Sequence, residues 1–183
     1  EYWAKPVTGF GDTDANLLII GLAPGAHGAN RTGRLFTGDH SGQWLMKALH
    51  EIGFSNNPSS ISAKDGLILK NVFITSCLRC APPSNKPVNS ELVNCSNYLV
   101  KELEVLKKVK VVITLGHIAF QTYCKINELK KLQFYHLAKY RINDKHLIVS
   151  YHPSRQNTNT QKLTWPMWIN VFDLAKTILS SNN

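Results

Sequence analysis

The chain has 183 residues, with 21 Lys and Arg against 12 Asp and Glu, so its formal net charge at pH 7 is +9. This length suits one domain with a sizeable core, and the basic balance favours a polyanionic partner such as nucleic acid, although charge alone does not decide this. No apolar run approaches the ~20 residues of a membrane span, and no secretory signal peptide is recognisable.

Four apolar runs are typical of buried parallel strands, at 17–20, 72–76, 111–115 and 146–151. Between and after them, apolar residues recur every three to four positions, which predicts helices over 44–52, 90–107, 118–123 and 168–179. Ser90 is the candidate N-cap of the second helix, and 56–65 is a polar surface loop. Alternating strands and helices predict an α/β fold, a single three-layer α/β/α sandwich over 1–183 with a central, mostly parallel four-stranded sheet.

The segment 21–39 follows the first predicted strand and reads GLAPGAHGANRTGRLFTGD. Its glycines allow backbone N–H groups to approach a ligand closely. The same segment carries hydrogen-bond donors, an aromatic ring and a carboxylate: His27, Asn30, Arg31, Arg34, Phe36 and Asp39. We therefore interpret it as a ligand-binding loop; the alternative is a strand followed by an irregular loop.

Two further polar motifs follow predicted strands. RCAPPSNKP at 79–87 comes after the second strand, and YHPSRQNTNTQKLT at 151–164 comes at the end of the fourth. In open parallel sheets, ligands bind beyond the carboxyl ends of the strands. We therefore expect Asp39, Asn85 and His152 to meet at one edge of the sheet.

The three motifs, in this order, resemble the active-site motifs of the type-5 (family B) uracil-DNA glycosylases and cover most of the chain. Type-4 enzymes carry a glutamate where this chain has Leu22, and type-1 enzymes carry an aspartate at about Ala23. The absence of both acids is the type-5 pattern and draws attention to Asp39.

The resemblance implies a monofunctional DNA glycosylase that flips and excises uracil, and also other deaminated bases such as hypoxanthine, at the start of base excision repair. Its partner would be DNA that contains such bases. We expect a monomer, because one flipped base needs one site, and a cytoplasmic, nucleoid-associated protein of prokaryotic type.

Cleavage of an N-glycosidic bond leaves positive charge on the sugar and negative charge on the departing base. By the resemblance, His152 donates to the base as a neutral imidazole, Asp39 stabilises the sugar cation and orients water, and Asn85 reads the base edge or holds the sugar. Each has a structural alternative. His152 packs at a strand end, Asp39 caps a helix, and Asn85 shapes a Pro-rich turn.

The predicted base pocket has Phe36 as its stacking platform, with a core position as the alternative. Gly25 stands where type-1 enzymes carry a tyrosine that excludes the thymine methyl group, so its small size predicts room for bulkier bases. Ser76 lies near the position of a type-4 asparagine. Further contacts are expected from the first loop, at Gly21, Ala23, His27 and Asn30.

The HPSRQNTNT loop is expected to approach DNA. Ser154 and Thr158 are candidates for phosphate contacts, which fix register without reading sequence. Three residues of this loop are expected to enter the DNA groove or to fill the gap left by the flipped nucleotide: Arg155, Gln156 and Asn157. Further phosphate contacts are predicted at Arg31, Arg34 and Lys86, for which the alternative is an ordinary solvated charge.

The four cysteines are Cys77, Cys80, Cys95 and Cys124. Type-4 and type-5 glycosylases bind a [4Fe–4S] cluster through four thiolates, of which two match Cys80 and Cys95. The other two come from an earlier C-x-x-C, which we expect upstream of residue 1. Two alternatives are an incomplete set and a site that Cys77 joins; otherwise Cys77 and Cys124 are small core residues.

Two other function classes fit parts of the sequence. The first is a non-catalytic module that recognises damaged DNA or a nucleotide, which the lack of an acid in GLAPG favours. The second is an iron–sulfur electron carrier. A metal-dependent hydrolase is disfavoured, because no carboxylate cluster suited to Mg²⁺ is evident.

Overall fold

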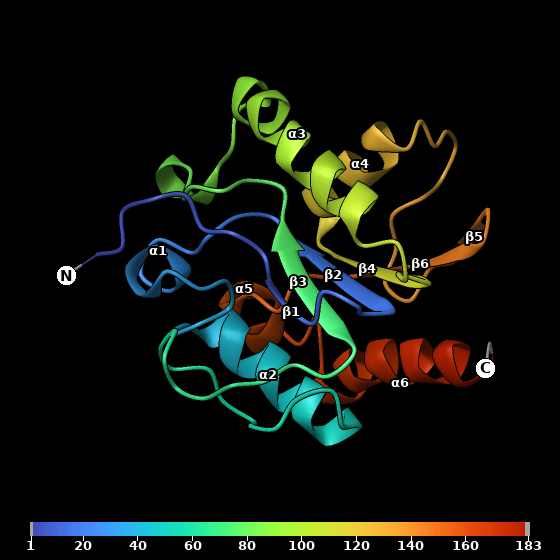
Figure 1. The fold of residues 1–183 in the computed structure, drawn as a ribbon, viewed down its shortest axis with the longest axis horizontal. Helices are drawn as coiled ribbons and strands as arrows, with labels where there is room; N and C mark the ends of the chain where they lie inside the picture. The colour runs from blue at the N-terminus through green and yellow to red at the C-terminus, as the bar shows by residue number, and fades with distance from the viewer. Residues whose placement is uncertain (1, 182–183) are drawn as a thin grey trace.

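The structure, a computed structural model, describes residues 2–181. Its centre is a six-stranded sheet of order β1-β3-β2-β4-β6-β5 (Figure 1). The four inner strands are parallel and coincide closely with the four predicted strands. They are β2 (Leu17–Gly21), β3 (Val72–Ser76), β4 (Val111–Leu115) and β6 (Lys145–Ser150).

The prediction of a four-stranded sheet missed both edge strands. β1 (Phe10–Gly11) pairs antiparallel with β3, and β5 (Lys139–Ile142) pairs antiparallel with β6. β1 has two residues, which is too short for any hydrophobic period to be visible. β5 reads KYRI, and its basic residues are typical of an edge that resists pairing with another sheet.

Helices cover both faces of the sheet, as expected for a three-layer sandwich (Figure 1). α2 (His40–Ile52) and α6 (Trp165–Ser181) pack on one face, and α3 (Asn89–Val105) and α4 (His117–Ile126) pack on the other. Ile19 contributes to the first core and Ile20 to the second. Because strand side chains alternate between two buried faces, the inner strands read as continuous apolar runs.

Three short helical turns lie in the motif loops: α1 (Ala29–Thr32), the 3₁₀ turn η1 (Pro83–Asn85) and α5 (Arg155–Asn159). The predicted cap of α3 was wrong. Val88 is the N-cap, and its N–H donates to the Glu91 carboxylate at 2.8 Å, so Ser90 lies inside the helix. A side chain three residues into the helix thus satisfies the free backbone donor.

The order of the strands explains where a ligand can bind. From β2 the chain passes through α2 to β3 on one side, and from β3 it passes through α3 to β4 on the other side of β2. Such a reversal opens a crevice at the carboxyl ends of the strands. The three sequence motifs begin at or just after the ends of β2, β3 and β6.

Among residues 2–181, no helix combines the length and apolar character needed to cross a membrane.

Candidate active site

A cavity of about 520 Å³ lies at the carboxyl ends of the strands and receives residues from all three motifs. Residues singled out from the sequence line it: Ala23, Gly25, His27, Phe36, Asp39, Asn85, His152, Ser154 and Arg155. The structure therefore confirms that Asp39, Asn85 and His152 meet at one edge of the sheet. Sequence reasoning had assigned no contact to the remaining lining residues, which are Leu22, Ala26, His40, Ser41 and Pro82.

Asp39 is the N-cap of α2, which confirms the helix-capping alternative, and it also lines the cavity. Its Oδ1 accepts the N–H of Gly42 at 2.8 Å. Its Oδ2 lies against the first loop: a Cβ at Gly28 would come within 2.0 Å of that oxygen, and one at Gly25 within 2.7 Å. Real Cβ contacts are never this close, so the carboxylate position depends on two glycines. The room at Gly25 is partly used by the carboxylate itself.

The protonation of Asp39 is set by two opposing effects. Burial raises its pKa above the ordinary value of 3.8, while the backbone N–H groups of Gly42 and Ser41 and the charges of His40 and Arg155 lower it. Burial dominates, so the pKa is raised. A carboxylate that caps a helix and faces a cavity at the same time is suited to stabilising positive charge there.

Phe36 forms a wall of the cavity beside His152. The two rings are stacked at a tilt of 29°, with their centroids 6.2 Å apart. Phe36 has a positive φ of 50°, and its ring lies on Gly21, where an added Cβ would be 2.9 Å from the ring. Gly21 itself is buried and supports the aromatic ring from outside the cavity lining, which corrects its assignment as a substrate contact.

His152 follows β6 and faces the cavity. Burial lowers its pKa to about 4, so the imidazole is neutral in the neutral pH range. Its backbone carbonyl accepts the side-chain amide of Asn157 at 2.9 Å. A neutral imidazole held in place can donate one hydrogen bond without placing a charge in the cavity.

The loop after His152 is tied to the start of α2. Ser41 Oγ donates to the carbonyl of Pro153 at 3.1 Å, and His40 Nε2 lies 2.9 Å from Thr158 Oγ1. Ser154 caps α5 by accepting the N–H of Asn157. The first and last motifs are thereby linked across more than a hundred residues of sequence. Hydrophobic periodicity does not single out His40 as a site residue. The one sequence feature that could have indicated its role is its position next to Asp39.

The residues of this loop that were predicted to contact DNA differ in exposure and in hydrogen bonding. Thr158 and Asn157 hold the loop together through internal hydrogen bonds. Arg155 and Gln156 are exposed on α5, and Arg155 also borders the cavity.

The middle motif reaches the cavity through Pro82 and Asn85. Asn85 is exposed and has a positive φ of 55°, which asparagine tolerates better than most residues. The loop is anchored at its start by Arg79, which donates to Glu102 on α3 at 2.7 Å and to Thr75 at 3.0 Å. Lys86 follows Asn85 and is exposed.

Three other first-loop residues lie at or near the rim. Ala23 and His27 line the cavity. Arg31 is exposed, with its Nε donating to the His27 carbonyl at 3.0 Å. The structure does not place the Asn30 side chain in the cavity lining; its amide lies 3.5 Å from the Ala26 carbonyl.

The structure contradicts two further assignments, those of Arg34 and Ser76. Arg34 is buried, with Nη2 donating to both carboxylate oxygens of Asp65, at 2.8 and 2.9 Å, and to Ser60 at 2.7 Å. It holds the 56–65 loop and is not available to phosphate. Ser76 is also buried, and its hydroxyl donates to the Leu78 carbonyl at 2.7 Å, so it is not a base contact.

The cysteines do not assemble a metal site within residues 2–181, where no group of three or more His, Cys, Asp or Glu side chains could hold a metal ion. Cys80 is exposed and Cys95 half-buried, and both are free thiols. Two thiols alone do not fit a four-thiolate [4Fe–4S] cluster. Cys77 is fully buried and burial raises its pKa to about 12, which confirms its interpretation as a core residue.

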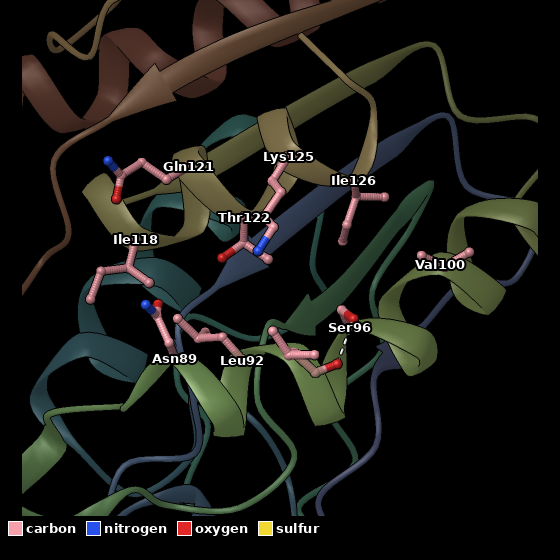
Figure 2. A pocket seen from close by; sticks show the side chains of 10 residues that line it. Asn89, Leu92, Ser96, Val100, Ile118, Gln121, Thr122, Lys125 and Ile126 are labelled. Carbon is pink, nitrogen blue, oxygen red and sulfur yellow. Dashed lines mark hydrogen bonds between the residues drawn. The ribbon is translucent and has the colours of Figure 1, made fainter. Parts of the chain in front are cut away.

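A second cavity, of about 530 Å³, lies between α3 and α4, away from the three motifs. Figure 2 shows the side chains of the two helices facing each other across it. Half of its lining residues are aliphatic, Leu92, Val100, Ile118 and Ile126 among them, and Lys125 is its one charged member among the described residues. The lining of this second cavity contains no pair of acid and base groups, whereas Asp39 and His152 both line the first cavity.

The comparisons with known proteins agree with the geometry. A family model described as the uracil DNA glycosylase superfamily matches residues 8–175. The type-5 uracil-DNA glycosylase of Thermus thermophilus is 48% identical over 178 residues, which cover 96% of this chain and 81% of that protein. The type-5 enzyme of Pyrobaculum aerophilum is 45% identical over 90% of this chain and 72% of its own length. A type-4 uracil-DNA glycosylase of Sulfurisphaera tokodaii is 28% identical over 97% of this chain and 78% of its own length.

The burial of Arg34 predicts different effects for two neighbouring arginines. Arg34→Gln should lower the free energy of unfolding by about 3 kcal/mol, because it leaves Asp65 without its charged partner. Arg31→Gln, at an exposed position, should change it by less than about 0.5 kcal/mol. Urea unfolding followed by circular dichroism measures both, and equal effects would contradict the structural role of Arg34.

The same ion pair predicts a pH dependence. Burial opposes ionisation of Asp65, but hydrogen bonds from Arg34 and from the N–H groups of Ile61, Leu67 and Ser62 outweigh it and lower the pKa to about 2. A lowered pKa gives stability that is present above the unfolded value of about 3.9 and is lost as pH falls towards 2. Arg34→Gln should weaken this acid-induced loss.

Proposed function

The chain belongs to the uracil DNA glycosylase superfamily and, within it, to the type-5 enzymes, and we propose that it excises uracil from DNA as a monofunctional glycosylase. The observation that carries the proposal is the cavity where Phe36, Asp39 and His152 meet. Such an enzyme performs the first step of base excision repair, and we place its action on the DNA of a prokaryotic nucleoid.

Binding of the base would use a flat surface and one polar edge. A base inside a duplex cannot be reached, so it is flipped into the cavity at the cost of unstacking. Phe36 provides the stacking surface, fixed by its contact with Gly21. Asn85 offers both a donor and an acceptor, which suits the carbonyl and N–H groups of a uracil edge.

In the chemical step, His152 and Asp39 would stabilise the two opposite charges of the transition state. His152 would act on the negative base and Asp39 on the positive sugar. As the bond breaks, the base gains negative charge, and the neutral imidazole of His152 donates a hydrogen bond to its oxygen. The sugar gains positive charge, which the Asp39 carboxylate stabilises. The same carboxylate orients the water that completes hydrolysis.

Water as the nucleophile agrees with the composition of the cavity. Within residues 2–181, no lysine lines it, so an imine between enzyme and sugar has no obvious amine there. The working unit in this proposal is a monomer, because one flipped base needs one site.

Activity on hypoxanthine is the broader part of the proposal. A cavity of about 520 Å³ falls within the usual range for small-molecule sites, about 300–1,000 Å³, so its volume does not exclude a purine. Asp39 Oδ2 occupies part of the space next to Gly25, so this glycine leaves less room for a bulky base than its small size alone predicts.

The DNA strand would be held by exposed residues around the cavity. Arg31, Lys86 and Arg155 come from the three different motifs, and Gln156 follows Arg155 on α5. Cationic side chains of this kind neutralise phosphates and make binding dependent on salt.

We further propose that Cys80 and Cys95 supply two of four thiolates to a [4Fe–4S] cluster, with the other ligands outside residues 1–183. Support comes from their accessibility as free thiols at either end of the segment that carries Asn85 and Lys86. The cluster would be structural and would order this segment.

The catalytic proposal predicts cleavage of a duplex with a single U·G or hypoxanthine·T pair, after alkali only, because a monofunctional enzyme leaves an intact abasic site. Asp39→Asn should lower the single-turnover rate about a hundredfold or more, since the sugar cation loses its counter-charge. Wild-type protein that binds the duplex without forming abasic sites would instead establish a non-catalytic damage-recognition module.

The same assay across pH identifies the group that must be ionised. Because Asp39 has a raised pKa, the rate should fall with decreasing pH at a value above the ordinary 3.8. Asp39→Asn has no group to ionise at this position, so the part of the acid limb that belongs to Asp39 should disappear in that variant. An unchanged limb in Asp39→Asn would contradict the assignment.

The cluster proposal is tested on the full-length protein by assaying iron and acid-labile sulfide. Cys80→Ser and Cys95→Ser should each reduce both contents, whereas Cys124→Ser, a half-buried thiol on α4, should not. Full iron content in both of the first two variants would exclude these cysteines as ligands.

A further inference from the structure

The segment 2–7 lies along the first motif loop, beside α1 (Figure 1). The N–H groups of Trp3 and Ala4 donate to the carbonyls of Arg31 and Asn30, at 3.3 and 3.4 Å. The Trp3 ring covers Gly33, where an added Cβ would come within 2.8 Å of the indole. The segment is thus bound to the loop that builds the cavity, which sequence reasoning had not associated with it.

Tyr2 reaches from this segment to a residue of the cavity wall. Its hydroxyl oxygen lies 2.6 Å from Nδ1 of His27, and the two rings meet edge to face with centroids 6.1 Å apart. His27 lines the cavity. Within residues 2–181 its ring makes no other hydrogen bond, so Nε2 remains free to bind a ligand.

The chemistry of this pair fixes the direction of the hydrogen bond. A phenol O–H is a better proton donor than a neutral imidazole N–H, and an unprotonated imidazole nitrogen is a better acceptor than a phenol oxygen. Tyr2 therefore donates to Nδ1, which places the imidazole proton on Nε2. Nε2–H then becomes a donor.

We propose that Tyr2 is a positioning residue of the active site, which holds His27 in the tautomer and orientation that donates from Nε2 to an acceptor oxygen of the substrate nucleotide. The inference rests on the proposed function, because it needs a nucleotide in the cavity. The oxygen belongs either to the base, as a carbonyl, or to the phosphate next to the flipped sugar. Both have the same acceptor chemistry.

Tyr2→Phe in the full-length protein tests the hydroxyl alone, since it keeps the ring and its packing. The single-turnover rate on a U·G duplex should fall about fivefold, the worth of one hydrogen bond. Tyr135→Phe is the matched control, because Tyr135 is similarly exposed, at 52% against 48%, and lies outside the cavity lining. An unchanged rate in Tyr2→Phe would overturn the proposal.

A double variant separates positioning from general structure. If Tyr2 acts through His27, Tyr2→Phe should have no further effect in a His27→Ala background. Additive losses would overturn the proposal. ¹⁵N NMR of the free protein gives a readout that does not depend on catalysis: His27 should carry its proton on Nε2, and Tyr2→Phe should produce a mixture of tautomers. An Nδ1-protonated His27 in the unmodified protein would overturn it.

Two ligands distinguish the sources of the acceptor oxygen. If it is the base carbonyl, Tyr2→Phe should weaken inhibition by free uracil; if it is phosphate, the variant should weaken only the binding of an abasic duplex. No change with either ligand would contradict the contact. Failure of the wild-type protein to excise uracil would count against the proposed function, whereas normal wild-type excision with a silent Tyr2→Phe would count against this inference alone.

Discussion

The position of one carboxylate organises the site. Asp39 caps α2 with Oδ1, while Oδ2 occupies a gap that exists because residues 25 and 28 have no side chain. This constraint explains why a glycine-rich loop follows β2: it admits the carboxylate as well as a ligand. Burial in that gap also raises the pKa of Asp39, and the backbone donors at the helix start limit the rise. One residue thus joins the start of a helix, a tight loop and the proposed chemistry.

The rest of the site is held to this point by hydrogen bonds between distant segments. Ser41 and His40, in the first turn of α2, bind the loop that follows His152, and Arg79 anchors the loop that carries Asn85 to α3. The hydrogen bond between Tyr2 and His27 adds the segment 2–7 to the same arrangement. Groups fixed in this way need little reorganisation when charge develops on a substrate, which is the usual source of electrostatic catalysis.

The sequence predicted the inner strands because burial on both faces leaves continuous apolar runs, and strand order then brought three motifs to one edge. The edge strands were not predicted, because β1 is too short and β5 is too polar to show a hydrophobic period. Arg34 was predicted to contact phosphate, because its true partner, Asp65, lies 31 residues away in a separate loop and leaves no local signal. His40 forms a hydrogen bond with Thr158, and Tyr2 forms one with His27; such side-chain pairings leave no trace in composition or periodicity.

The most direct test of this account is the excision rate of Gly28→Ala, in which the new methyl group would meet Asp39 Oδ2. With folding verified by circular dichroism, the rate should fall as far as in Asp39→Ala, and the double variant should be no slower than either single one. Such non-additivity would show that Gly28 matters through the carboxylate. A near-normal rate in Gly28→Ala would contradict the claim that the carboxylate must occupy the glycine-lined gap.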